Sequence, residues 1–84
     1  MSRISVEFYG LARLRAGVAE LAVEAGTVRA ALEAVQAAYP QLRVLSDTGL
    51  SPEFLLSLGG ERFTTDLNEP LCGPLLILGA DAGG

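Results

Sequence analysis

Hydrophobic and polar residues alternate in two stretches near the start of the sequence, with the two-residue period of a strand that buries one face. In residues 4–9, every second residue from Ile4 to Phe8 is hydrophobic, and in residues 20–24 the hydrophobic positions alternate with glutamates. Between them, Gly10 and Gly17 bracket the segment LARLRA, which could form a turn of helix. We therefore expect two strands paired in hairpin geometry.

The spacing changes after Gly26 and indicates an amphipathic helix. Thr27 is suited to cap its N-terminus, and Pro40 ends it. The hydrophobic positions follow at intervals of three and four residues, so they form one stripe that can pack on a sheet. They are Val28, Ala31, Leu32, Val35 and Tyr39, while Arg29, Glu33 and Gln36 are expected to point away.

The second half of the chain contains turn-forming residues between short hydrophobic runs. Residues 41–53 are mixed in character and predict an irregular connection. Residues 54–58 predict a strand, Gly59-Gly60 a tight turn with positive φ, and residues 61–63 the hairpin partner. Residues 75–78 are uniformly hydrophobic, which is typical of a central strand. The predicted fold class is α+β, with one main helix on one face of a mixed sheet and the other face open.

Length and charge limit the classes of protein and partner. A chain of 84 residues, half of them hydrophobic, supports one domain, which we place at residues 1–78, followed by a flexible tail at residues 79–84. Ten acidic residues outnumber six arginines, and lysine is absent. Because the arginines are scattered, no nucleic acid partner is expected, and a cationic partner surface fits better.

The residue types present exclude most familiar catalytic sites. Without histidine and with one cysteine, the chain has no Ser-His-Asp triad, Cys-His pair or Cys/His zinc site. Glu61 with Asp66 or Glu69 could pair for acid-base chemistry, but solvated surface charges are the favoured interpretation. Cys72 is expected to be a small semi-buried filler, with a reactive role as the less favoured alternative.

The start of the sequence lacks the pattern of a secretory signal, and no hydrophobic run is long enough to cross a bilayer. We expect a cytoplasmic protein with no membrane partner.

The end of the sequence, residues 79–84, consists almost entirely of small residues and finishes in Gly83-Gly84. One interpretation is a frayed terminus, in which glycine has no role. The other is a thin segment that enters a narrow channel in a partner, with an unhindered carboxyl group at its end. Six extended residues would reach roughly 20 Å. On composition alone the two interpretations are about equally supported.

Several of these segments resemble the MoaD/ThiS family of ubiquitin-like sulfur carriers. The length, and the segment between the helix and the third strand, are more similar to the small subunit of molybdopterin synthase (MoaD) than to ThiS. The resemblance implies the ubiquitin-like β-grasp fold. The matching segments are residues 6–17, residues 28–40, residues 55–71, the strand LLIL and the Gly83-Gly84 end.

The resemblance also implies a chemical role for the last residue. Gly84, with Gly83 as its slim neighbour, would be adenylated by an ATP-dependent enzyme of MoeB/ThiF type and converted to a thiocarboxylate. The chain would act as a carrier, bind no cofactor itself, and join a MoaE-type large subunit in a heterotetramer that delivers sulfur to precursor Z. The expected partner-binding residues are Leu76, Leu78, Gly79, Ala80, Asp81 and Ala82.

Three alternatives stay open at this stage. The sulfur could serve another pathway, such as cysteine or thiamine synthesis or tRNA thiolation. The same Gly84 could instead be joined to lysines of other proteins, as in a ubiquitin-like modifier. The chain could also be a non-catalytic interaction domain that uses the open sheet face.

Overall fold

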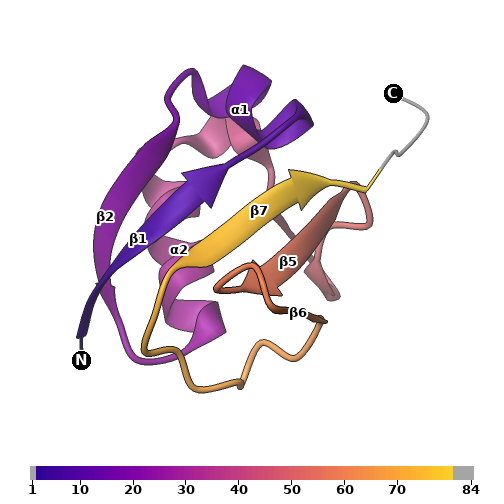
Figure 1. Ribbon diagram of the computed structural model, residues 1–84. Coiled ribbons are helices and arrows are strands. Elements are labelled where there is room, and N and C mark those ends of the chain that lie inside the picture. The colour runs from indigo at the N-terminus through magenta and orange to yellow at the C-terminus, as the bar shows by residue number, and fades with distance from the viewer. Residues whose placement is uncertain (1, 81–84) are drawn as a thin grey trace.

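The computed structural model describes residues 2–80, which form a five-stranded sheet, two α-helices, a 3₁₀ helix and a small separate hairpin (Figure 1). In chain order the elements are β1 Ser2–Phe8, α1 Leu11–Ala16, β2 Glu20–Ala25, α2 Val28–Ala38, the 3₁₀ helix η1 Pro40–Leu42, β3 Leu45–Ser46, β4 Gly49–Leu50, β5 Phe54–Leu58, β6 Arg62–Thr64 and β7 Leu75–Gly79.

The sheet has the strand order β2-β1-β7-β5-β6, so β7 is its central strand, as its uniform hydrophobicity predicted. β1 runs parallel to β7, and the other neighbouring strands are antiparallel. Helix α2 covers one face of this mixed sheet, and none of residues 2–80 forms a helix on the opposite face (Figure 1). The predicted α+β class, with one main helix on one face, is confirmed.

Helix α2 begins and ends where the sequence predicts. The Thr27 hydroxyl accepts a hydrogen bond from the Ala30 amide at 3.2 Å, and the helix ends at Ala38, two residues before Pro40. Its hydrophobic stripe is fully buried against the sheet at Val28, Ala31, Leu32 and Val35. Among residues 2–80 no helix has the length and hydrophobicity to span a membrane.

The core lies between α2 and the inward faces of the strands. The predicted inward residues of β1, from Ile4 to Phe8, are buried. The Gly59-Gly60 turn also forms as predicted, with φ of 63° and 77°. These left-handed values favour glycine because they bring a Cβ close to the backbone. The turn aligns β6 with β5, and the pairing joins Ser57 to Phe63.

The prediction of an irregular connection at residues 41–53 was wrong in two respects. The segment contains part of η1 and the β3–β4 hairpin, and its Leu42 and Val44 are fully buried. Gln36 does not simply point away from the core, because its side-chain oxygen accepts a hydrogen bond from the Val44 amide at 3.0 Å. This contact from the helix to the loop holds the buried pair in place.

Cys72 also differs from the sequence-based expectation. The thiol was expected to be semi-buried, but Cys72 is exposed. It lies in the turn-rich stretch before β7, where the backbone hydrogen bond from Gly59 to Pro74, at 2.8 Å, supports the loop without needing the cysteine as filler. The filler interpretation is therefore wrong.

Candidate functional site: the open sheet face and the end of β7

The alternation of β7 places two of the predicted partner-binding residues on the open face of the sheet. Leu75 and Ile77 are fully buried on the helix side, whereas Leu76 and Leu78 are half-buried on the opposite side. Leu78 is paired in register with Leu55 of β5, whose side chain is 40% exposed. Leu76 and Leu78, which were expected to bind a partner, therefore lie on the face opposite to α2.

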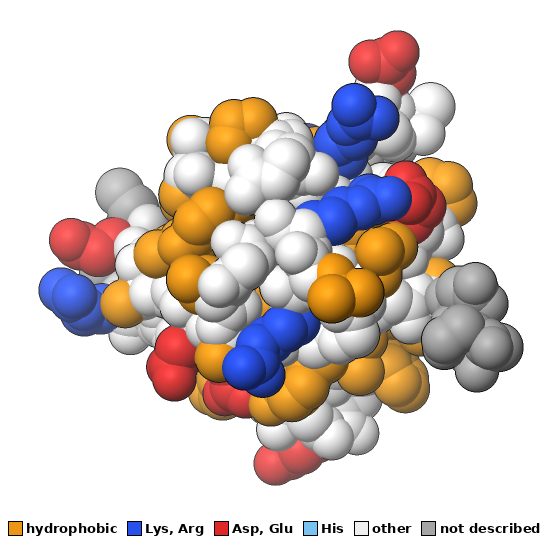
Figure 2. All heavy atoms as spheres, turned by 90° about the horizontal axis from the view of Figure 1, so that it is seen from above, with side chains coloured by type: hydrophobic (Ala, Val, Ile, Leu, Met, Phe, Trp, Pro, Cys, Tyr) orange, Lys and Arg blue, Asp and Glu red, His pale blue; other side chains and the backbone are white. Residues whose placement is uncertain are grey.

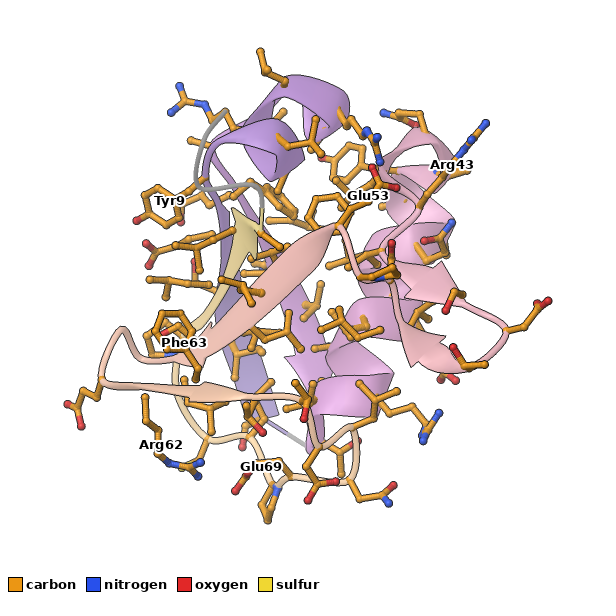
Figure 3. All side chains as sticks on the ribbon, turned by 90° about the vertical axis from the view of Figure 1, so that its right-hand side faces the viewer. Tyr9, Arg43, Glu53, Arg62, Phe63 and Glu69 are labelled. Atoms are coloured by element: carbon orange, nitrogen blue, oxygen red, sulfur yellow. The ribbon has the colours of Figure 1, made fainter. Side chains whose placement is uncertain are left out.

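These leucines belong to a larger hydrophobic surface, which we call the sheet-face patch. Tyr9 is 43% exposed and Phe63 is 65% exposed, and Figure 3 shows both projecting from the same side of the sheet. Ser57 pairs with both Leu76 and Phe63, so these two side chains flank it in one row. The sheet-face patch comprises Tyr9, Leu55, Phe63, Leu76 and Leu78.

Three members of this patch, Tyr9, Leu55 and Phe63, were not singled out from the sequence. Alternation in residues 4–9 marks Tyr9 as an outward position, whereas the short runs that hold Leu55 and Phe63 do not alternate. Only the pairing of the strands shows that the three side chains lie together. Exposed hydrophobic side chains that gather on one face are typical of a protein-binding surface. The open face therefore carries a candidate docking surface centred on β7 and β5.

The other half of the open face carries three glutamates and one arginine, Arg3, which is paired in register with Glu24. Glu7 on β1 is paired in register with Glu20 on β2, and Glu24 lies further along β2. The Tyr9 hydroxyl donates a hydrogen bond to the Glu7 carboxylate, which raises the pKa of Tyr9 above its ordinary value. The Ser5 hydroxyl donates to Glu20 at 3.0 Å. The sheet-face patch thus has a carboxylate border along β1 and β2.

The end of β7 lies beside this patch and is tied to the domain. Gly79, expected to begin the tail, is the last residue of β7 and pairs with Phe54. The Ala80 amide then donates a hydrogen bond to the Glu53 carbonyl at 2.7 Å, because the β5–β7 backbone ladder continues past the strand. Asp81, Ala82, Gly83 and Gly84 lie outside the described residues, and their roles stay predictions.

A shallow hollow of about 360 Å³ opens next to Ala80, lined also by Leu11, Pro52 and Glu53. Figure 2 views this end of the molecule and shows hydrophobic side chains interspersed with arginines. Ala80 therefore has side chains to pack against and a backbone carbonyl to which it is hydrogen-bonded. One of the lining side chains, Glu53, is a carboxylate.

Two of the three carboxylates considered for acid-base chemistry, Glu69 and Asp66, have structural partners, and the third, Glu61, is exposed. Glu69 accepts hydrogen bonds from Arg62 at 2.7 Å and from Thr64 at 3.2 Å. The Arg62 guanidinium holds the pKa of Glu69 below its ordinary value, as expected for a carboxylate beside a cation. Asp66 accepts from the Asn68 amide in a turn. Within residues 2–80, no group of three or more acidic or cysteine side chains could hold a metal ion.

Comparison with solved structures finds ubiquitin-like proteins that match over nearly the whole chain. The crystal structure of SAMP1 from Haloferax volcanii is 26% identical, with a TM-score of 0.82, and the match covers 99% of this chain and all of that one. The solution structure of small archaeal modifier protein 1 from Methanosarcina acetivorans is 20% identical, with a TM-score of 0.85, over 100% of this chain and 98% of that one.

A third structure, provisionally assigned as molybdopterin converting factor subunit 1 from Pyrococcus furiosus, is 16% identical with a TM-score of 0.68, over 93% of this chain and 94% of that one. No protein-family model matches the sequence, and no curated protein matches it significantly. The ubiquitin-like β-grasp fold is confirmed by the first two likenesses. The third structure shares the same fold.

Proposed function

We propose that this protein is a sulfur carrier whose reactive group is the carboxylate of Gly84. An ionised carboxylate is a poor acyl donor and must be activated before sulfur is attached. In the proposed cycle, the carboxylate attacks the α-phosphorus of ATP in the active site of a MoeB/ThiF-type enzyme, and pyrophosphate leaves. Hydrosulfide (HS⁻) then attacks the acyl carbon and AMP leaves, so that a glycyl thiocarboxylate remains. The catalytic side chains belong to the partner enzymes.

The observation that carries this proposal is the position of the sheet-face patch beside the end of β7. Leu78 belongs to the patch, and two residues later Ala80 is fixed to the Glu53 carbonyl. The four residues that follow Ala80, up to Gly84, span at most roughly 14 Å when extended. A partner that receives Gly84 must therefore lie close to the end of β7, where the patch offers it a hydrophobic contact.

For the acceptor, we propose the molybdopterin synthase pathway. The carrier would dock on a MoaE-type large subunit, in a heterotetramer with two carriers, and its thiocarboxylate would pass sulfur to precursor Z. The length of the chain and its resemblance to the MoaD branch support this choice over thiamine, cysteine or tRNA thiolation pathways. We place the whole cycle in the cytoplasm.

The mass of the protein purified from its own cells tests the carrier function. Replacing one terminal oxygen by sulfur adds about 16 Da to the intact chain. We expect a chain that ends at Gly84 and carries this increment. Iodoacetamide should then add two groups, one at the exposed Cys72 thiol and one at the terminal thiocarboxylate, whereas a chain without the thiocarboxylate takes only one. A mature chain that continues past Gly84, or one that never carries sulfur in cells making the cofactor, would contradict the proposal.

Changing the last residue gives a matched test in vitro. Deleting Gly84, or adding one alanine after it, should abolish adenylation by the activating enzyme, because the reacting carboxylate is then displaced by one residue. The unfolding temperature should not change. Ala80 is the last described residue that is hydrogen-bonded to the domain, and Gly84 lies four residues beyond it. AMP formation at the wild-type rate in either variant would rule out Gly84 as the reactive residue.

A second candidate, a protein modifier, is favoured by the likeness to SAMP1 from Haloferax volcanii. The same activated Gly84 would then be transferred to a lysine amine of a target protein, with AMP as the leaving group. Because the 84 residues contain no lysine, the chain cannot build lysine-linked chains on itself. An immunoblot of cell extract decides between the two functions, since a modifier gives a series of larger conjugates and a carrier gives one band.

A further inference from the structure

Ala80 is held on two sides at the point where the chain leaves the domain. Its amide donates to the Glu53 carbonyl at 2.7 Å, which fixes it to the start of β5. On the other side, the preceding Gly79 lies against α1, where an added Cβ would come within 3.3 Å of the Leu11 Cβ. The direction of the chain at Ala80 therefore depends on where Glu53 is held.

Glu53 is held by an arginine that connects three segments. Its Oε1 accepts from Arg15 Nη2 at 2.6 Å, and Arg15 Nη1 donates to the Leu42 carbonyl of η1 at 3.2 Å. The Arg15 guanidinium carbon lies 5.7 Å from the centre of the Phe54 ring. The Arg15 carbonyl accepts from Gln41 Nε2 at 3.0 Å. Helix α1, η1 and the start of β5 thus meet at this one side chain.

The ion pair between Arg15 and Glu53 is expected to contribute little to the stability of the whole fold. The Arg15 and Glu53 side chains are 29% and 44% exposed, and partly exposed ion pairs contribute little to folding. We propose that Arg15 and Glu53 are positioning residues, which fix the Glu53 carbonyl and through it the direction in which the chain leaves the domain after Ala80. Figure 3 shows Glu53 at the end of the molecule where β5 begins. This inference rests on the proposed function, because a fixed direction matters only if the following residues enter a partner.

The proposed role predicts which kinetic constant depends on the ion pair. Each residue that is fixed before docking is one fewer to be ordered when the enzyme binds. Loss of the ion pair therefore weakens the binding of the carrier to the activating enzyme by the same amount in the ground state and in the transition state. The KM for the carrier should rise, and the kcat of adenylation should stay the same.

The first test measures amide hydrogen exchange at Ala80 by NMR, in the full chain without any partner. The Ala80 amide should be protected in the wild type and exchange about threefold to fivefold faster in Arg15→Gln and in Glu53→Ala. Arg62→Gln is the matched control, because it breaks the Arg62–Glu69 pair on β6 and leaves Glu53 alone. Exchange at Ala80 that is unprotected in the wild type, or unchanged in both variants, would overturn the inference.

The second test measures adenylation of the same proteins by the activating enzyme. Arg15→Gln and Glu53→Ala should raise KM about threefold to fivefold at constant kcat, Arg15→Lys should recover part of the loss, and Arg62→Gln should have no effect. An unchanged KM, or a fall in kcat alone, would overturn the inference. A wild type protected at Ala80 but never adenylated would overturn the proposed function, and with it the role of the pair. An unprotected Ala80 in a protein that is adenylated normally would overturn only the role of the pair.

Discussion

The side chains of the sheet-face patch keep part of their hydrophobic surface in water, although the same strands bury their other faces completely. Leu55 and Phe63 are exposed, while Leu56 between them in the sequence is buried in the core. Burying a large hydrophobic side chain contributes about 1.5–3 kcal/mol, so these residues hold binding energy that folding does not use. A partner that covers the patch would recover it.

Leu55→Asp should weaken docking of the activating enzyme or large subunit more than it lowers stability. A charge on the patch must be desolvated in the complex but stays in water in the free protein, so we expect Kd to rise at least about tenfold. Leu78→Asp should have the same effect on Kd, with a larger loss of stability because Leu78 is half-buried. Titration calorimetry gives Kd and urea unfolding gives stability.

Ala37→Asp on the exposed side of α2 is the control for this experiment, because it adds the same charge on the opposite side of the sheet. An equal Kd for wild type and Leu55→Asp would remove the patch from the docking surface.

Among the elements, those with strong periodicity could be predicted from the sequence, and those that depend on contacts across the fold could not. Helix α2 matches its predicted extent closely, because the spacing of its hydrophobic residues shows which positions are buried. Strand β5 also matches its predicted extent, as a short hydrophobic run that turn-forming residues bound. The β3–β4 hairpin has only two residues in each strand, too few to show a period.

The same limit applies to the candidate site. Residues 75–78 are uniformly hydrophobic, so the sequence does not show which way Leu78 faces, and the register that brings it beside Leu55 is a property of the assembled sheet. The sequence suggested a binding face along β7, but it did not show how far the patch extends across the neighbouring strands.

The buried residues missed in the segment after α2 should matter for stability. Leu42→Ala removes a fully buried side chain and should lower the free energy of unfolding by about 2–5 kcal/mol, a large part of the total for a small domain. Leu14→Ala makes the same chemical change at a side chain that is 80% exposed on α1, and should cost less than about 0.5 kcal/mol. Urea unfolding of both variants measures the difference, and equal costs would show that the segment does not belong to the core.

The ion pair between Arg62 and Glu69 connects β6 to the loop before β7 and should make stability depend on pH. Because the folded pKa of Glu69 lies below its ordinary value of 4.5, the contribution is present above that value and is lost as the pH falls through the folded pKa. Wild type should exceed Glu69→Gln in urea midpoint at neutral pH, and the gap should narrow as the pH falls below 4.5 and Glu69 becomes protonated in the folded protein. A gap that is constant across this range would show that Glu69 acts without its charge.

Across the whole molecule, the charge is arranged around the proposed docking surface. The net charge is −4, and three of the ten acidic residues, Glu7, Glu20 and Glu24, lie on the β1–β2 half of the open face. One arginine, Arg3, lies there too, so this half keeps an excess of negative charge. The sheet-face patch occupies the β7–β5 half of the same face. A partner that covers both halves needs a hydrophobic area beside a basic one, which agrees with the cationic partner surface expected from composition.

This arrangement predicts that association depends on salt. Opposite charges on two approaching surfaces raise the association rate, and dissolved ions screen them over roughly 10 Å at 0.1 M salt. The double variant Glu20→Gln with Glu24→Gln should associate with the partner severalfold more slowly at low salt, and its rate should vary less with salt than that of the wild type. The dissociation rate should change little, because border charges act mainly during approach. Stopped-flow measurement over a range of salt concentrations separates the two rates, with Glu33→Gln on the outer side of α2 as the control. A wild-type association rate that does not fall as salt is added would show that the acidic half of the sheet does not face a basic surface.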